Sequence, residues 1–220
     1  MRILITGGCG YIGTELTKKL SLNKKNKITI IDTQWFGNKI KKTSNVKIKK
    51  FDIRNIKNLR GKFDCIIHLA NIANDPTVEL SPNLSWEVNV LATMKLCEFA
   101  LERKIKKIIY FSSGSVYGIK KEKKVTEDLS LKPISVYNKT KMIAERIFLS
   151  YKDKLHIICL RPATVCGVSD RIRLDITINK LTYDAITKNK IFVDGGSQIR
   201  PNVYIQDIIN VVFFFLKKNR

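Results

Sequence analysis

The 220-residue sequence predicts an α/β fold built on a doubly wound parallel sheet. Three observations predict this fold. Short apolar segments alternate with segments of helical spacing along most of the chain. Some apolar runs, such as residues 63–69, are nearly continuous, which is typical of parallel strands covered on both faces. A glycine-rich turn over residues 6–13 follows the first apolar segment and opens the first helical one.

Each element follows from its local pattern. The expected strands cover residues 2–6, 27–32, 46–51, 63–69, 105–112 and 155–160. The expected helices cover residues 11–22, 85–103 and 136–151. Pro162 ends the last of these strands, because proline cannot donate to a strand ladder. Helices between consecutive strands imply right-handed crossovers and therefore a parallel sheet.

The alternation changes after Gly167. There we expect a helix over residues 175–188, a short strand near residues 191–193, a turn at 195–196, a short strand at 203–205 and a final helix to about residue 218. No linker or repeat separates these parts from the rest. The sequence therefore predicts a main domain over residues 1–166 and a small C-terminal appendage, residues 167–220, interleaved with it.

Composition is that of a globular protein, with 44% hydrophobic and 9% aromatic residues. The formal net charge of +22 comes from 41 Lys and Arg against 19 Asp and Glu. Two interpretations are open: a lysine-rich solvated surface, or a positive field that attracts anionic ligands such as nucleotide diphosphates. No basic helix with interleaved aromatic residues is present, so nucleic acid is the lesser alternative as a partner.

The five cysteines form no CxxC pair and no metal-ligand spacing, so no metal site is expected. They are typical of small core residues in a reducing cytoplasm, where we expect the protein to be located. No signal peptide is expected, because the first strand begins at Arg2. The apolar run at 208–216 contains Asn210 and is too short to span a bilayer, so no membrane partner is expected.

The glycines of the first turn are spaced as GxxGxxG, at Gly7, Gly10 and Gly13. Between a strand and a helix, this spacing permits a tight turn and a close approach of pyrophosphate to the helix N-terminus. Asp32 lies 19 residues after Gly13, at the end of the second strand. A carboxylate there accepts hydrogen bonds from the ribose hydroxyls of NAD and repels the extra phosphate of NADP.

Tyr137 and Lys141 are four residues apart on a predicted helix and therefore share one helix face. An ammonium beside the phenol would favour the phenolate and lower the pKa of Tyr137 toward neutrality. Such a phenolate, next to a nicotinamide ring, can take a hydroxyl proton while hydride leaves the same carbon. The pair thus predicts dehydrogenase-type chemistry.

These residues belong to an ordered set of motifs: residues 6–13, 51–54, 68–71, 89, 111–118, 137–141, 161–162 and 200–207. With this set the chain resembles the extended short-chain dehydrogenase/reductase superfamily, and within it the NAD-dependent sugar-nucleotide epimerase/dehydratase family. The resemblance implies a Rossmann NAD-binding domain over residues 1–166, a substrate-binding region over 167–220, a nucleotide-sugar substrate, and a homodimer formed through the helices at 85–103 and 136–151.

The resemblance also implies roles for individual residues. The implied catalytic residues are Ser113, Tyr137 as the base and Lys141 as its pKa partner. The implied NAD contacts are Gly7, Gly10, Tyr11, Ile12, Gly13, Asp32, Asp52, Ile53, Leu69, Ala70, Asn89, Ser112, Tyr137, Lys141 and Pro162. The implied substrate contacts are Ser113, Thr164 and Arg200, the last gripping a diphosphate. For Asn89, bracing of nearby backbone is an equal alternative, and His68 is expected to be a satisfied core residue.

The resemblance implies a common first step, in which Tyr137 takes a sugar hydroxyl proton and a 4-keto sugar forms. Dehydratases of this family carry an Asp-Glu pair just after the catalytic hydroxyl residue, and related decarboxylases keep a Glu there. This chain has Gly114 and Ser115, which cannot shuttle a proton as a carboxylate does. The expected activity is therefore 4-epimerisation of a nucleotide-activated sugar, with surface polysaccharide synthesis as the family-level setting.

Three alternatives remain open: a dehydratase or reductase of the same family, a non-catalytic NAD-binding module, and a basic nucleic-acid-binding Rossmann protein. Two departures from the family bear on the choice. Thr164 stands where many members carry a substrate-contacting Asn. The chain also stops at Arg220, whereas extended members continue through a larger substrate domain, so we expect either a minimal lid or a truncated C-terminal region.

Overall fold

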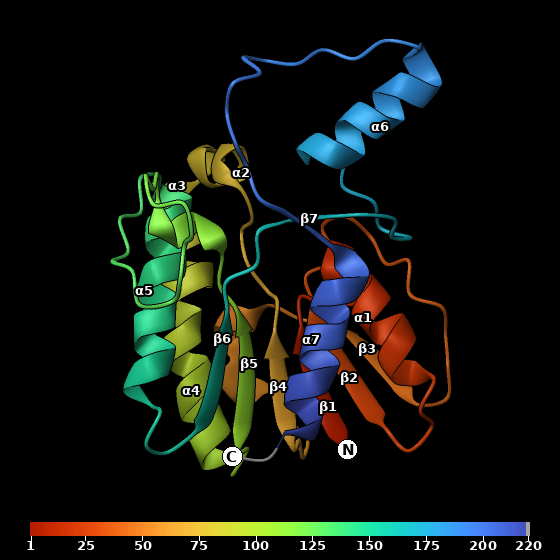
Figure 1. Ribbon diagram of the computed structural model, residues 1–220. Helices are drawn as coiled ribbons and strands as arrows, with labels where there is room; N and C mark the ends of the chain where they lie inside the picture. Colours follow the sequence, from red (N-terminus) through yellow and green to blue (C-terminus); the bar gives the residue numbers. More distant parts are fainter. Residues whose placement is uncertain (219–220) are drawn as a thin grey trace.

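Six parallel strands form the central sheet in the order β3-β2-β1-β4-β5-β6 (Figure 1). The computed structural model describes residues 1–218. The strands are β1 (Arg2–Thr6), β2 (Lys27–Asp32), β3 (Val46–Lys50), β4 (Cys65–His68), β5 (Lys107–Phe111) and β6 (His156–Leu160). The strand order reverses between β1 and β4, and in doubly wound sheets ligands bind outside the carboxyl ends of the strands at such a point. The predicted fold class is confirmed.

Burial explains the pairing of the central strands. All four residues of β4 are buried, and Ile3, Leu4 and Ile5 of β1 are at most 1% exposed. The edge strand β3 has no fully buried residue and carries the exposed Lys47 and Lys50, which discourage pairing with another chain. The prediction that His68 is a core residue is confirmed: its Nδ1 lies 2.6 Å from Thr6 Oγ1, and burial lowers its pKa to about 3.

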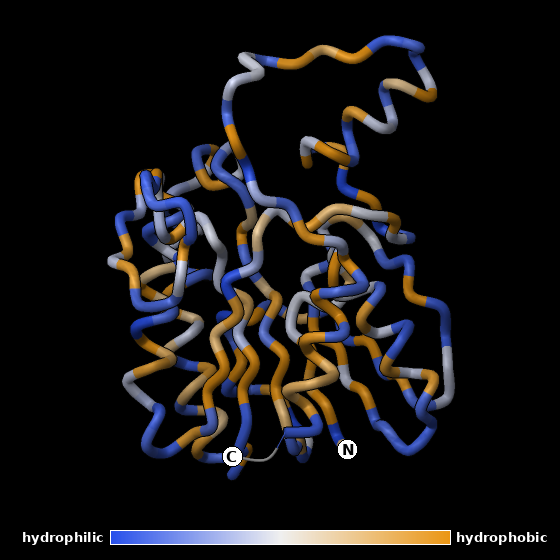
Figure 2. Tube along the Cα trace, in the orientation of Figure 1, coloured by the Kyte–Doolittle hydropathy of each residue, from blue (hydrophilic) through white to orange (hydrophobic). Residues whose placement is uncertain are grey.

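Helices cover both faces of the sheet. On one face α1 (Tyr11–Ser21) and α7 (Ile205–Lys217) share a hydrophobic cluster with Ile3 and Ile5. On the other face α4 (Ala92–Glu102) and α5 (Val136–Ser150) share a second cluster with Leu4. Successive strand residues thus point to opposite cores, and the apolar positions gather along the strands in Figure 2. The homodimer expected through the second helix layer stays a prediction.

The helical region before β5 differs from the single helix predicted over residues 85–103. It consists of α2 (Asp75–Leu80), α3 (Pro82–Trp86), a π-helical segment η2 (Glu87–Leu91) and then α4. Pro82 favours a helix start before residue 85. Proline has no backbone N–H, and at the first turn of a helix that N–H would have no partner within the helix. Two 3₁₀ segments, η1 (Ile53–Asn58) and η3 (Gly114–Tyr117), follow β3 and β5. Single-turn π segments are frequent at functional sites, and η2 contains Asn89.

The C-terminal region contains a second, two-stranded sheet in which β7 (Thr164–Cys166) pairs in parallel with β8 (Asn202–Tyr204). The helix α6 (Thr177–Lys188) and the segment after it extend away from the main body (Figure 1). The strand predicted near residues 191–193 is wrong: Ile191 and Phe192 expose 50% and 68% of their surface and pair with no strand in the described chain. The boundary after residue 166 stays a prediction.

None of the helices within residues 1–218 is long and apolar enough to cross a membrane.

Candidate active site

The glycine-rich turn joins β1 to α1 at the switch point of the sheet. Gly7 has a φ of +70°, and a Cβ there would lie 2.5 Å from Ala70 N. A Cβ on Gly13 would lie 2.6 Å from Gly8 Cα, so the first turn of α1 packs directly on the loop. Gly10 caps α1 without a side-chain hydrogen bond, which leaves backbone N–H groups of the first turn free for an anion. Only glycine permits both of these close approaches.

Asp32 ends β2 beside this turn. Its Oδ2 accepts a hydrogen bond from Cys9 N at 3.0 Å, and its Oδ1 accepts one from Gln34 N at 2.7 Å. The carboxylate is therefore held at the carboxyl edge of the sheet, next to the glycine turn. This is the position that the predicted contact with a ribose requires.

Other predicted cofactor residues lie around the same edge with internal partners. Tyr11 donates its hydroxyl to the Gly167 carbonyl at 2.7 Å, which ties α1 to the C-terminal region, and Ile12 is half-buried. Asp52 caps η1 and pairs with Arg54, which lowers the pKa of Asp52, while Ile53 is buried in the core. These contacts position the backbone of the edge, and the cofactor roles of the side chains stay predictions.

The loop after β4 approaches the glycine turn closely. Leu69 N bonds to Thr6 O at 2.9 Å, and Ala70 N donates to Thr6 Oγ1 at 3.3 Å. Both residues of this loop are partly exposed, as a lining of a dinucleotide path requires. The structure therefore brings residues 7–13 and 69–70 together, although they are far apart in the sequence.

Asn89 is 1% exposed, and its amide bonds to Ile72 and Thr140. Its Oδ1 accepts from Ile72 N at 2.8 Å, and its Nδ2 donates to Ile72 O at 3.1 Å and to Thr140 Oγ1 at 3.1 Å. Thr140 in turn donates to the carbonyl of Tyr137 at 2.8 Å. Asn89 thus braces the loop after β4 against the helix that carries Tyr137, and its contact with a cofactor stays a prediction.

Tyr137 and Lys141 lie on α5, with electrostatics that differ from the sequence prediction. Burial raises the pKa of Tyr137 to about 12; the positive charge of Arg173 and a hydrogen bond with Ser113 oppose this shift. Burial lowers the pKa of Lys141 to about 7, and its Nζ donates to the Phe111 carbonyl at 2.7 Å. The predicted fall of the tyrosine pKa toward neutrality is therefore wrong for the protein alone, because desolvation outweighs the opposing effects of Arg173 and Ser113.

Ser113 and its neighbours form the turn between β5 and η3. Ser113 Oγ caps η3 by accepting from Ser115 N, and it lies 2.8 Å from Ser115 Oγ. The hydroxyl of Ser112 is buried and has no hydrogen-bond partner among the described residues. A buried hydroxyl without a partner is rare, and a bound polar group could satisfy it.

The remaining predicted residues follow β6. Pro162 accepts a hydrogen bond from Gly114 N at 2.8 Å, which places it against the turn that carries Ser113. Thr164 lies in β7 opposite Asn202 of β8, and Thr164 N bonds to Pro201 O at 3.3 Å. Arg200 is therefore close to Thr164 along the small sheet, but it is exposed. The diphosphate contact predicted for Arg200 stays a prediction.

Two arginines near the site were missed by the sequence reasoning. Arg173 acts electrostatically on Tyr137 and pairs with Asp175, whose carboxylate also accepts from Asn74 Nδ2 at 2.7 Å. Arg161 pairs with the buried Glu145 of α5. The effect of Arg173 on Tyr137 joins segments that are distant in the sequence, and for Arg161 only the Arg-Pro pair at 161–162 was a signal.

The residues of this edge fit a dinucleotide. The glycine turn offers free N–H groups at the start of α1, Asp32 offers a carboxylate to a ribose, and Ser112 offers an unpartnered hydroxyl. The described residues contain no group of three or more His, Cys, Asp or Glu that could hold a metal ion. The site is therefore suited to an organic cofactor with a pyrophosphate.

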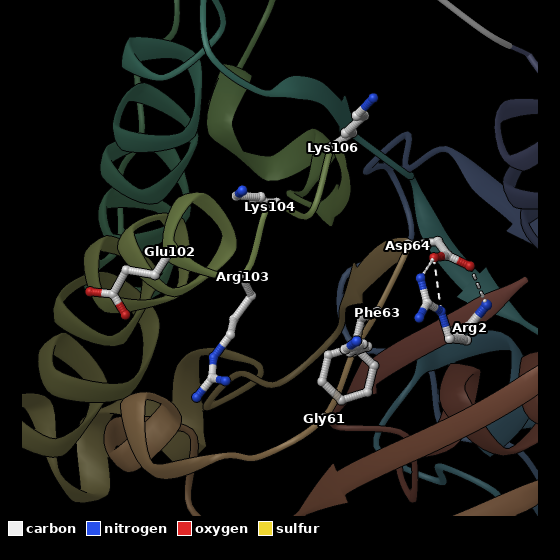
Figure 3. Close-up of a pocket in the computed structure, with 9 residues that line it drawn as sticks. Arg2, Gly61, Phe63, Asp64, Glu102, Arg103, Lys104 and Lys106 are labelled. Carbon is white, nitrogen blue, oxygen red and sulfur yellow. Dashed lines mark hydrogen bonds and ion pairs between the residues drawn. The ribbon is translucent and has the colours of Figure 1, made fainter.

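A hollow of about 540 Å³ lies at the opposite end of the sheet, where β1, β4 and β5 begin (Figure 3). Its lining includes Arg103, Lys104 and Lys106, and Arg2 there already pairs with Asp64. None of the predicted site residues lies in this hollow. The chemistry expected from the sequence therefore has no residues in this hollow.

Comparison with known proteins agrees with this geometry. The model of the NAD dependent epimerase/dehydratase family matches residues 3–220. The chain is 28% identical to a UDP-glucose 4-epimerase of Lactobacillus helveticus, over 99% of this chain and 72% of the relative. It is 31% identical to the uncharacterized UDP-glucose epimerase YtcB of Bacillus subtilis (strain 168), over 99% of this chain and 73% of the relative.

A solved structure is similar over the whole chain. The UDP-glucuronic acid 4-epimerase of Bacillus cereus, in complex with UDP-glucuronic acid and NAD, superposes with a TM-score of 0.86 at 29% identity. The alignment covers 100% of this chain and 74% of that structure. The chain belongs to the NAD-dependent epimerase/dehydratase family of sugar-nucleotide enzymes.

Proposed function

We propose that the protein is an NAD-dependent epimerase that inverts C4 of a nucleotide-activated sugar through a transient 4-keto intermediate. The observation that carries the proposal is that Ser113, Tyr137 and Lys141 lie around the carboxyl end of β5: Ser113 lies near Tyr137, and Lys141 Nζ donates to the Phe111 carbonyl. When bound, NAD would supply the acceptor and donor of the hydride. The similarity to epimerases that bind UDP-sugars supports a nucleotide sugar as the substrate.

In this proposal Tyr137 takes the proton from the C4 hydroxyl and later returns it, while Ser113 hydrogen-bonds the same oxygen. Ser113 is suited to this role because it lies close enough to Tyr137 to lower the pKa of the phenol against the effect of burial. The ammonium of Lys141 donates a hydrogen bond to the carbonyl of Phe111, which ends β5 just before Ser112 and Ser113. General-base assistance of this kind contributes roughly 10²–10⁴-fold to a rate.

The absence of a carboxylate after Ser113 favours epimerisation over dehydration. Gly114 is held tightly, because a Cβ there would lie 3.2 Å from Pro162 O, and Ser115 Oγ bonds back to Ser113. Neither residue can move a proton to or from the next sugar carbon. The 4-keto sugar can therefore only be reduced again, and hydride return to the opposite face of the sugar inverts C4.

A non-catalytic NAD-binding module is the second candidate. The exposure of Arg200 and of the segment around Phe192 favours it, because this region would leave a bound sugar open to solvent. Against it stands the set of Ser113, Tyr137 and Lys141, because a protein that only binds NAD does not need a phenol and an ammonium on one face of a helix.

The test is turnover of the purified protein on a panel of UDP-, GDP-, CDP- and dTDP-sugars with NAD added, read by NMR. We expect one C4 epimer to form and the Tyr137→Phe variant to lose roughly 10²–10⁴-fold in rate. Binding of NAD without conversion of any sugar would refute the epimerase and support the binding module.

A further inference from the structure

Arg161 lies between β6 and Pro162, and its guanidinium points into the protein toward α5. Its Nε donates to both carboxylate oxygens of Glu145, each at 3.1 Å, and its Nη2 pairs with the same carboxylate. The Glu145 side chain is 1% exposed and that of Arg161 is 18% exposed. This pairing is the bidentate geometry that arginine makes with carboxylates, here almost shielded from water.

The guanidinium of Arg161 forms a fork of three nitrogens, and the third, Nη1, bonds to two further segments. Arg161 Nη1 donates to the Tyr117 hydroxyl at 2.7 Å and to the Glu127 carbonyl at 3.2 Å. The guanidinium also lies 5.0 Å from the centre of the Tyr117 ring, within the range of a cation–π contact. One side chain therefore contacts α5, η3 and the loop before α5.

Two of the contacted segments, α5 and the η3 turn, carry residues of the proposed site. Glu145 follows Lys141 by four residues, and Lys141 follows Tyr137 by four, so the three share one face of α5. Tyr117 belongs to the η3 turn, which Ser113 caps. Pro162 is the next residue in the chain and accepts from Gly114 N at 2.8 Å. The fork thus sets the relative positions of Ser113 and Tyr137 without touching either.

Lysine could not replace this arginine. A lysine has the same charge, but its single ammonium cannot reach a carboxylate, a phenol and a carbonyl in the planar geometry of the fork. The pairing raises the pKa of Arg161 above its usual value, so the group stays charged across the working pH range. Arg161 therefore contributes the fixed directions of its hydrogen bonds in addition to its charge.

We propose that Arg161 is a positioning residue, which holds the Ser113 turn, the Tyr137–Lys141 helix and Pro162 in one arrangement through Glu145, Tyr117 and Glu127. The inference rests on the proposed function of this site. Nothing in it requires Arg161 to touch the sugar or the cofactor.

The test compares Arg161→Lys with the matched control Arg2→Lys. Arg2 also pairs with a carboxylate, that of Asp64, but at the opposite end of the sheet. For Arg161→Lys we expect turnover to fall by about 10²-fold, as for a small misplacement of reacting groups, with KM and the affinity for NAD unchanged. Arg2→Lys should leave turnover unchanged. Equal turnover of wild type and Arg161→Lys would overturn the proposal.

A second readout is independent of turnover. In protein with isotope-labelled tyrosine side chains, the NMR signal of Tyr137, assigned with Tyr137→Phe, should shift in Arg161→Lys and stay in place in Arg2→Lys. If no sugar is converted, the proposed function fails, yet this signal still tests the positioning. An unchanged Tyr137 signal would overturn it.

Should Arg161→Lys fold poorly, the double variant Arg161→Met with Glu145→Met removes both buried charges together, a change that folded proteins often tolerate. A folded double variant that keeps wild-type turnover would also contradict the proposal. One that loses turnover while keeping its NAD affinity would support it.

Discussion

Lys141 is almost fully buried, and its ammonium has a backbone carbonyl rather than a carboxylate as its hydrogen-bond partner. Burial therefore lowers its pKa from 10.5 to about 7. Between these two values the unfolded chain binds a proton that the folded chain does not, so the stability of the fold rises with pH across this range. A buried lysine whose pKa lies near the working pH is typical of a functional site and is seldom selected for stability.

This linkage predicts a difference between the wild type and Lys141→Met. The thermal midpoint of the wild type should rise relative to that of the variant as the pH is raised from about 7 toward 10. In this range the lysine is protonated in the unfolded wild type and not in the folded wild type, and the variant has no such group. Melting curves of the cofactor-free proteins across this range measure the difference. A wild-type midpoint that falls relative to the variant would show that Lys141 is charged and well paired in the fold.

Gly7 offers a second test at this scale. Gly7→Ala introduces a Cβ 2.5 Å from Ala70 N in a residue with positive φ, so it should push apart the two loops of the proposed cofactor site. The collision displaces one wall of the proposed cofactor site, and each 1.4 kcal/mol lost in binding weakens affinity about tenfold. We expect calorimetry to show NAD affinity at least about tenfold weaker.

Gly37→Ala is the matched control for this change. Gly37 has a φ of +76° but nothing within 4 Å of a built Cβ, so the substitution carries the backbone cost without the collision. It should lower stability and leave NAD affinity unchanged. Equal affinities for the two variants would mean that the contact between Gly7 and Ala70 has no part in the cofactor site.

Among the elements, the π-helical segment η2 has the clearest consequence. It places Asn89 where one amide bonds to both backbone groups of Ile72 and to Thr140 on α5. Removing the amide leaves these buried groups without partners, and each such group costs roughly 1–3 kcal/mol. The segment therefore couples the loop after β4 to the helix of the proposed base.

We predict that Asn89→Ala lowers the free energy of unfolding by several kcal/mol and reduces turnover, because the loop and α5 lose their common support. The matched control is Asn210→Ala on α7, where the exposed amide accepts a hydrogen bond from Lys19 Nζ; its effect should stay within about 0.5 kcal/mol. Denaturant unfolding curves give both values. Similar losses in the two variants would argue that Asn89 is an ordinary helix residue.

For the whole molecule, the sequence predicted the elements well where the signal was local. Strands β1 and β2 begin and end at the predicted residues, since apolar runs there meet turn residues on both sides. The glycine turn and Asp32 were likewise predictable, because one strand-turn-helix unit and the next strand contain them. These local patterns were enough to predict the parallel sheet.

Contacts between distant residues could not be predicted in this way. The bond from Tyr11 to Gly167 and the fork of Arg161 depend on how separate segments meet, as does the pairing of β7 with β8. The raised pKa of Tyr137 also required the structure, because the helical spacing that suggested a lowered value does not reveal burial. Geometry of this kind is set by tertiary packing.

The central claim is that C4 is oxidised and reduced again within one site, on opposite faces of the sugar. The most direct measurement follows a nucleotide sugar with deuterium at C4, with UDP-glucose and UDP-glucuronic acid as first substrates, in ordinary water by NMR and mass spectrometry. The account predicts a C4 epimer that keeps the deuterium at C4. Loss of water from the sugar, release of a 4-keto sugar with NAD reduced to NADH, or hydrogen from solvent at C4 would contradict it.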